Sequence, residues 1–299
     1  MTDYPERLVL SSGELTAELL PEWGSKMISL RTECDGYEFL APAPLGPHVP
    51  DAAVFSPADA YGFDEMFPAV YPQPYPVEPW HDVLIADHGD LWYRGWHCSD
   101  GGTEARLWVE DGRLGWRFGK HLQFINALTL QTEYRVENRS PYPLYWLYCA
   151  HFLCPYRAGI ELALPAGTYQ RQETLGLSLP EECREDADFL RRYDAFPARS
   201  AAYYVSDAVG ATACAYVDRS AGKVLRLSWS YPIAYLGVWC NNSAWTPGTP
   251  LVHLALEPTT AGNQDLAEWL RTGAPEPLAP GASVSWTMTF SASDTDSIT

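Results

Sequence analysis

The sequence lacks a long apolar run, is poor in basic residues and has no paired cysteine motif, and each absence excludes a class of protein. No segment of the 299 residues is long and apolar enough to predict a membrane span. Only 20 basic residues stand against 38 acidic ones, a net charge of −18 that disfavours binding to nucleic acid. The seven cysteines are odd in number and form no CxxC pair. Neither a disulfide framework nor a zinc ribbon is therefore expected.

Several catalytic signatures are also missing. There is no Gly-x-Ser-x-Gly elbow, no recognisable catalytic cysteine motif and no glycine-rich loop of the kind that holds phosphates or dinucleotides. Residues 1–7 do not show the basic and then apolar layout of a secretion signal. With thiols expected to stay reduced, we predict a cytoplasmic location.

What the sequence does contain is typical of a β protein. Short runs of Val, Leu, Ile, Thr, Tyr and Trp recur between Gly, Pro, Asn and Asp, and the aromatic residues number 12 Trp, 18 Tyr and 10 Phe. The expected strands occupy residues 7–10, 14–20, 25–32, 37–40, 103–111, 114–119, 127–138, 144–152, 202–205, 211–218, 224–229, 234–240, 252–256 and 283–290.

Little of the remaining chain predicts regular structure. Residues 41–79 are rich in Pro and Gly and indicate a long loop, which its aromatic side chains should keep ordered. Helical character is confined to residues 180–195 and to a short segment at 265–271. Without a linker or repeat, residues 1–299 are predicted to form a single domain, a large antiparallel β-sandwich with few short helices.

Three ionisable residues occupy positions that favour chemistry. Glu257 ends the buried run 252–256, His151 ends another apolar run, and His88 precedes Gly89, which allows a ligand to approach closely. A carboxylate with two histidines supplies an acid and a base near neutral pH. The same residues could form a metal site, but they lack the short spacing of typical zinc ligands, so metal binding ranks second.

Other interpretations stay open on these residues alone. Glu257 could simply meet water at the end of its strand. Glycoside hydrolysis needs two carboxylates, and Asp64 or Asp90 could partner Glu257.

The order of three short motifs resembles the aldose 1-epimerase (galactose mutarotase-like) superfamily. The motifs are Asp87-His88-Gly89, the segment 138–151 that ends at His151, and Leu256-Glu257-Pro258. The resemblance extends to Gly24 near the start and to Trp286 in the last predicted strand, so it covers nearly the whole chain.

The resemblance implies a β-supersandwich whose cleft binds a small carbohydrate, and an enzyme that interconverts sugar anomers without a cofactor. Glu257 would be the general base at the anomeric hydroxyl, and His151 the general acid at the ring oxygen. His88 would hydrogen-bond the substrate.

The sequence departs from the best-known members of that superfamily at one binding segment. Between Leu40 and Arg94 it has no Lys or Arg, whereas those members carry a sugar-binding arginine there. We expect the replaced contacts to come from Asp64 or Glu65, together with Trp92, Arg94 and Trp239, with a structural role for Glu65 or Trp239 as the alternative. Two further functions remain alternatives, a carbohydrate-binding protein without turnover and a sugar lyase or hydrolase.

Overall fold

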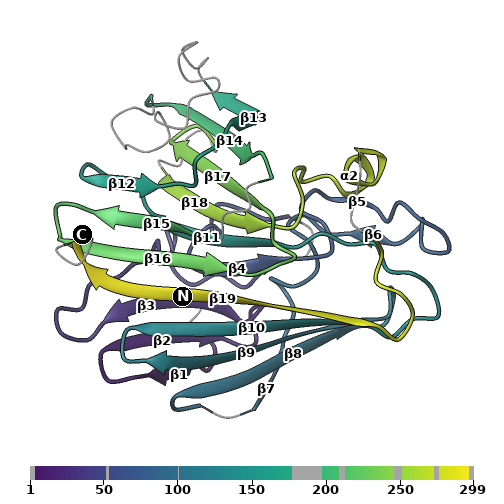
Figure 1. The fold of residues 1–299 in the computed structure, drawn as a ribbon, viewed down its shortest axis with the longest axis horizontal. Helices are drawn as coiled ribbons and strands as arrows, with labels where there is room; N and C mark the ends of the chain where they lie inside the picture. The colour runs from purple at the N-terminus through teal and green to yellow at the C-terminus, as the bar shows by residue number, and fades with distance from the viewer. Residues whose placement is uncertain are drawn as a thin grey trace.

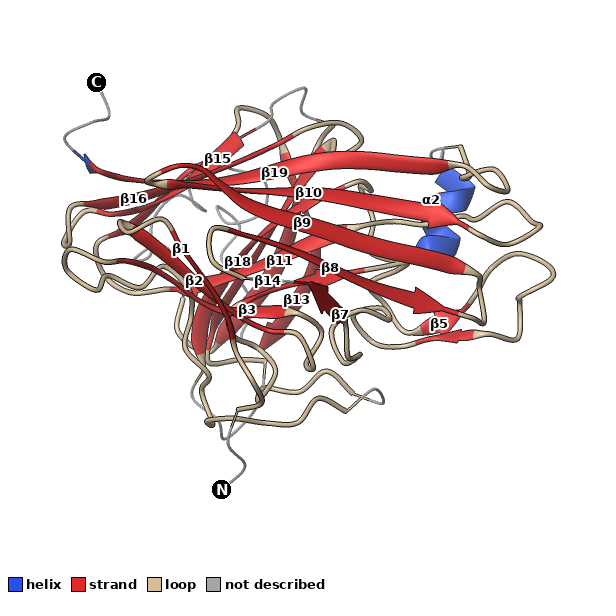
Figure 2. Ribbon diagram, turned by 90° about the horizontal axis from the view of Figure 1, so that it is seen from below, coloured by secondary structure: helices blue, strands red, loops and turns tan. Residues whose placement is uncertain are grey.

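The computed structural model describes residues 4–51, 54–99, 101–176, 197–208, 213–245, 251–272 and 276–295. Two large antiparallel sheets lie one upon the other and enclose the main core (Figures 1 and 2). This architecture confirms the predicted antiparallel β-sandwich. In the described part of the chain, no helix is long and apolar enough to cross a bilayer.

The first sheet has nine strands and carries the candidate site. In spatial order these are β1 (Leu8–Ser11), β2 (Leu15–Leu20), β3 (Lys26–Thr32), β4 (Phe63–Met66), β11 (Cys149–Pro155), β18 (Val252–Thr259), β17 (Tyr235–Asn242), β14 (Ser200–Ser206) and β13 (Tyr169–Gly176).

The second sheet has eight strands and covers one face of the first. Its strands are β12 (Ile160–Ala163), β15 (Ala213–Asp218), β16 (Lys223–Trp229), β19 (Ser283–Asp294), β10 (Thr129–Asn138), β9 (Trp116–Asn126), β8 (Glu104–Asp111) and β7 (His97–Ser99). In Figure 2, β19, β10 and β9 lie above β18, β11 and β14.

In the described part of the chain, a short strand pair and a short helix lie outside these sheets. The strands β5 (Gln73–Pro74) and β6 (Leu84–Ile85) form a pair of their own. The helix α2 (Leu266–Thr272) lies near β5, and its Ala267 N–H donates to the Gln73 side chain over 3.1 Å. Asp265 caps the helix by accepting from the Glu268 N–H at 3.0 Å, which is a common way for a helix to begin.

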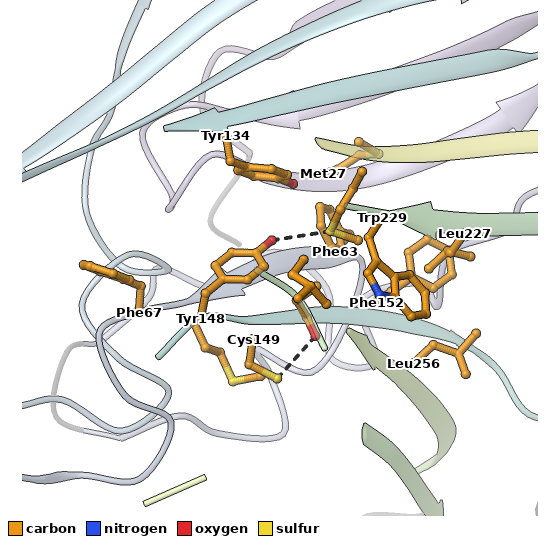
Figure 3. Close-up of a cluster of buried hydrophobic side chains, with 14 of the residues drawn as sticks. Met27, Phe63, Phe67, Tyr134, Tyr148, Cys149, Phe152, Leu227, Trp229 and Leu256 are labelled. Atoms are coloured by element: carbon orange, nitrogen blue, oxygen red, sulfur yellow. Dashed lines mark hydrogen bonds between the residues drawn. The ribbon is translucent and has the colours of Figure 1, made fainter. Parts of the chain in front are cut away.

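Alternation along the central strands determines which side chains enter the core. Phe63, Phe152 and Leu256 are fully or almost fully buried and belong to the main core cluster (Figure 3). Phe63 and Phe152 both pack on Phe290 of the second sheet, with ring centres 5.2 and 5.7 Å apart. Because strand side chains alternate, the neighbours of these residues face away from the second sheet.

A charged pair crosses the core between the sheets. Lys120 of β9 donates to both carboxylate oxygens of Glu65 at 2.9 Å, and Tyr134 adds a hydrogen bond of 3.0 Å. A further bond of 2.9 Å joins the ammonium to the carbonyl of Ser25. Burying a charge is costly unless it is paired and hydrogen-bonded, so these contacts offset the free-energy cost of placing Glu65 inside the sandwich.

Most predicted strands are confirmed, but the prediction at residues 37–40 is wrong. Only an isolated bridge joins Arg31 to Glu38 there, because the Glu38 carboxylate replaces ladder bonds by accepting from the N–H groups of Leu30 and Leu40, each at 2.9 Å. The predicted helix at 180–195 lies outside the described residues.

The predicted loop at 41–79 and the predicted strand at 144–152 also need correction. The loop contains the central strand β4, whose two carboxylates hid its buried character in the sequence. β11 begins only at Cys149, because backbone groups before it bond to loops: the Leu147 N–H donates to the carbonyl of Pro68 and the Tyr145 N–H to the hydroxyl of Tyr75.

The charged pair in the core generates a stability prediction. Replacing Lys120 with Met leaves the Glu65 carboxylate buried without its cation, and we expect a loss of about 3–5 kcal/mol in the free energy of unfolding. The double variant Lys120→Met with Glu65→Leu should recover most of that loss. Urea unfolding of the two variants and the wild type measures both effects. A single variant within about 0.5 kcal/mol of the wild type, the range of an ordinary surface change, would contradict the prediction.

Candidate active site

Three neighbouring strands place three ionisable side chains in one row across the first sheet. Asp64 of β4 pairs directly with His151 of β11. Phe152 of β11 pairs with Leu256 of β18, and the same register places His151 opposite Glu257. The row therefore lies on the face turned away from the second sheet, opposite to the apolar residues of the core.

Above this row lies a cavity of about 210 Å³. Its described lining combines ionisable and amide groups with aromatic walls: Asp87, His88, His151, Glu173, His253, Glu257, Gln264, Phe55, Tyr71, Tyr203, Trp239 and Trp245, with Ala60, Met66, Val70 and Leu175 completing it. The cavity thus has the mixed character of a small-molecule site, with polar groups among apolar walls.

The His151 ring is held by a buried ion pair. Its Nδ1 lies 3.0 Å from an Asp64 oxygen, and the other Asp64 oxygen accepts from Lys26 Nζ at 2.5 Å. Burial favours a protonated Asp64, but Lys26 and His151 outweigh this effect and keep the pKa of that carboxyl below its ordinary value. The Asp64 carboxylate therefore accepts a hydrogen bond from the Nδ1–H of His151, which leaves Nε2 available to other partners.

Burial also sets the pKa of His151 itself. Desolvation lowers the pKa of the imidazole below 6.5, while the hydrogen bond and charge of Asp64 act in the opposite direction. The net shift is downward, so His151 is mainly neutral at pH 7.

Glu257 is almost completely buried, and no salt bridge reaches it from the described residues. Desolvation raises the pKa of its carboxyl to about 8. The thiol of Cys149, 3.5 Å from Oε2, and the nearby hydroxyl of Tyr203 moderate this effect, while the charge of Asp64 adds to it. A carboxyl that titrates near neutral pH is suited to proton transfer.

His88 reaches the cavity from a strained loop. Its own φ is +60°, and the φ of Gly89 is +77°. A Cβ on Gly89 would lie 2.5 Å from the carbonyl oxygen of Phe67, so only glycine fits there. The His88 ring stacks on Phe55 with 3.8 Å between centres, and its centre is 5.5 Å from that of His151.

Of the remaining sequence-predicted contacts, Trp239 lines the cavity and Asp64 lies beneath it as the partner of His151. Trp92 supports the wall from behind, with its ring edge-on to Phe55 at 5.2 Å between centres. Its Nε1 donates to the carbonyl of Asp87 at 2.8 Å.

Glu65 and Arg94 do not line the cavity. Glu65 projects from the opposite face of β4 into the core, and the guanidinium of Arg94 lies 3.5 Å from Asp111. Asp90, which could have partnered Glu257 in hydrolysis, is instead bonded to Arg113 at 2.5 Å.

Several cavity residues escaped the sequence analysis. Phe55 and Tyr71 come from the loop at 41–79, and Tyr203 and Trp245 come from segments without a motif. His253 could have been found, because it lies four positions before Glu257 on the same strand and therefore on the same face. Among the described residues, no group of three or more His, Cys, Asp and Glu side chains is arranged to hold a metal ion.

Comparison with known proteins places this geometry in a structural context. No family model matches the sequence, and no curated protein matches it. The Slr1438 protein of Synechocystis sp. PCC 6803 is structurally similar, with a TM-score of 0.72 at 15% identity over 98% of this chain and 97% of that one.

Two other similar structures carry functional names. A candidate aldose 1-epimerase of Escherichia coli K12 has a TM-score of 0.72 at 16% identity, over 97% of this chain and 99% of its own. A galactose mutarotase related enzyme of Lactobacillus acidophilus has a TM-score of 0.66 at 13% identity, over 97% and 98%. The TM-scores establish the fold, whereas sequence identities this low leave the activity open. The chain has the galactose mutarotase-like fold.

Proposed function

We propose that this protein is an aldose 1-epimerase-like enzyme, which interconverts the anomers of a free sugar without a cofactor. One observation carries the proposal: Glu257 and His151 lie opposite one another on adjacent strands and line the same cavity. A ring opening needs a base at the anomeric hydroxyl and an acid at the ring oxygen, and this pair supplies both.

In the productive state the pair carries one proton, and it lies on His151, although the higher pKa of Glu257 makes the opposite arrangement the more populated one. The Glu257 carboxylate takes the proton of the O1 hydroxyl while the His151 imidazolium gives a proton to the ring oxygen O5, so that the C1–O5 bond breaks and an aldehyde forms. Rotation about C1–C2 exposes the other face of the carbonyl. The two proton transfers then run in reverse and close the ring in the opposite configuration. Each positioned transfer contributes about 10²–10⁴-fold.

The residues around the pair support these steps. Asp64, held ionised by Lys26, stabilises the imidazolium that His151 must form. His88 lies beside His151 and, as the superfamily resemblance implies, would hydrogen-bond the substrate near O5.

The cavity walls favour an unphosphorylated sugar. Phe55, Trp239 and Trp245 offer aromatic faces, which stack on the apolar face of a pyranose. Among the described lining residues there is no Lys or Arg, whereas Asp87 and Glu173 bring negative charge. A sugar phosphate would meet repulsion without a compensating cation.

The first test of this function replaces Glu257 with Gln, which keeps the shape of the side chain but removes the base. We expect the rate of anomer exchange to fall at least 100-fold, roughly the contribution of one acid or base. Saturation-transfer NMR over a panel of free aldoses and one hexose 6-phosphate measures the exchange. Glu110→Gln, at a half-exposed glutamate on the second sheet, is the matched control.

Equal rates in the wild type and Glu257→Gln would remove Glu257 from the mechanism. Sugar binding by calorimetry without any exchange would favour the alternative, a carbohydrate-binding protein without turnover. Bond cleavage detected by mass spectrometry would instead favour a lyase or hydrolase.

The pH dependence of exchange follows from the two shifted groups. One shared proton is required, so kcat/KM should decline below the lowered pKa of His151, where both groups are protonated, and above the pKa of about 8 of Glu257, where neither is. The profile should be bell-shaped, with its maximum between these values. Initial exchange rates from pH 5 to 10 measure it, and a rate independent of pH throughout would contradict the assignment.

Buried Glu257 also has a consequence for stability that does not depend on turnover. Its folded-state pKa of about 8 exceeds the ordinary 4.5. Its favourable contribution to the free energy of unfolding is therefore complete below pH 4.5, where the carboxyl is neutral, and is lost as pH rises through 8. By linkage, this loss is on the order of 4 kcal/mol. The Glu257→Gln variant cannot ionise at this position and does not suffer the loss. Its unfolding free energy relative to the wild type should therefore rise by this order between pH 5 and pH 9. Urea unfolding at both pH values is the measurement; parallel behaviour of the two proteins would show that Glu257 is not desolvated.

A further inference from the structure

The hydroxyl of Tyr203 lies in the candidate site without a partner. Tyr203 is 2% exposed, lines the cavity, and its hydroxyl makes no hydrogen bond in the described structure. Buried polar groups are nearly always paired, because leaving one unpaired costs free energy. Because Tyr203 lines the cavity, an unpaired hydroxyl on this side chain points to a partner supplied by a ligand.

The position of this hydroxyl depends on a glycine in the neighbouring strand. Tyr203 of β14 pairs with Trp239 of β17, but its ring leans across β17 toward Gly237. A Cβ at Gly237 would lie 2.2 Å from the Tyr203 hydroxyl oxygen. Gly237 has no positive φ, so the backbone itself does not require glycine there. The space it leaves is filled by Tyr203.

Gly237 pairs with Glu257 of β18, so the hydroxyl ends beside the proposed base. Desolvation, together with the nearby Glu257 carboxyl, raises the pKa of the phenol well above 10. Tyr203 consequently keeps its proton at any working pH and can donate a hydrogen bond. Glu257 and Gln264 both lie close enough to interact electrostatically with the hydroxyl, but neither meets it at the distance and angle of a hydrogen bond.

We propose that Tyr203 is a further substrate-binding residue, whose hydroxyl donates to the sugar oxygen lying between it and Glu257. This inference rests on the proposed function. It assigns to β14 a direct contact at the reacting end of the sugar, made possible by the absence of a side chain at Gly237.

The test is Tyr203→Phe, measured with the aldose that the wild type exchanges fastest. Loss of the bond should weaken sugar binding by calorimetry, and reduce kcat/KM for exchange, by roughly tenfold. Without sugar, the melting temperature should rise by about 2 °C or more, because the variant no longer buries an unpaired hydroxyl. A tyrosine that only packs would leave the dissociation constant unchanged, and that result overturns the proposal.

Two further variants separate contact from packing. Tyr204→Phe alters the next residue of β14, which faces the core, and should leave sugar binding unchanged. Gly237→Ala should displace the Tyr203 ring and reproduce the tenfold loss, yet cost little more when combined with Tyr203→Phe. Additive losses from Gly237→Ala and Tyr203→Phe would mean that the glycine acts independently of the hydroxyl, against the proposal.

The results also distinguish this inference from the function beneath it. If no sugar in the panel binds or exchanges with the wild type, the proposed function and the Tyr203 contact fall together. If the wild type is active and Tyr203→Phe matches it in binding and rate, only the contact is lost.

Discussion

The cost of burying charge is the constraint on which the rest of the structure depends. Asp64 and Glu65 are consecutive residues of one strand, point to opposite faces, and are both buried. Each has its own lysine: Lys26 on the cavity side and Lys120 in the core. Glu257 has no such cation in the described structure, so desolvation raises its pKa to about 8. Lys26 keeps the pKa of Asp64 below its ordinary value, whereas at Glu65 burial outweighs Lys120 and raises the pKa. Glu257 differs from both because it faces the cavity and has no cation among the described residues.

Sequence patterns were sufficient for the architecture and for three of the residues that line the cavity. The β-rich composition and regular turns predicted an antiparallel sandwich, and the order of three motifs selected His88, His151 and Glu257, all of which line the cavity. His151 and Glu257 could be recognised because a polar residue at the end of an apolar run is conspicuous, and His88 because it precedes a glycine.

The rest of the site depended on information that no local pattern contains. Because β4 lies in a segment without visible periodicity, the sequence could not decide which of Asp64 and Glu65 faces the cavity, and a shift of one residue exchanges the two faces. Tyr203 reaches the site only because β14 and β17 are neighbours and Gly237 leaves room, facts of strand order and register. Arg94, a plausible contact from its sequence position, is held instead by Asp111.

The row of ionisable residues joins segments that are far apart in sequence, which determines when the candidate site can form during folding. His151 is separated by 87 residues from Asp64, and Cys149, two positions before it, is 108 residues from Glu257. Closing such long loops costs chain entropy before the contacts that offset this cost can form. The ladders of β8, β9 and β10, in contrast, join segments that are adjacent in sequence. The hairpins of the second sheet can therefore form before the residues of the ionisable row come together. The proposed acid, the proposed base and the carboxylate beside the acid meet only in the completed topology, because the shortest segment that contains all three runs from Asp64 to Glu257.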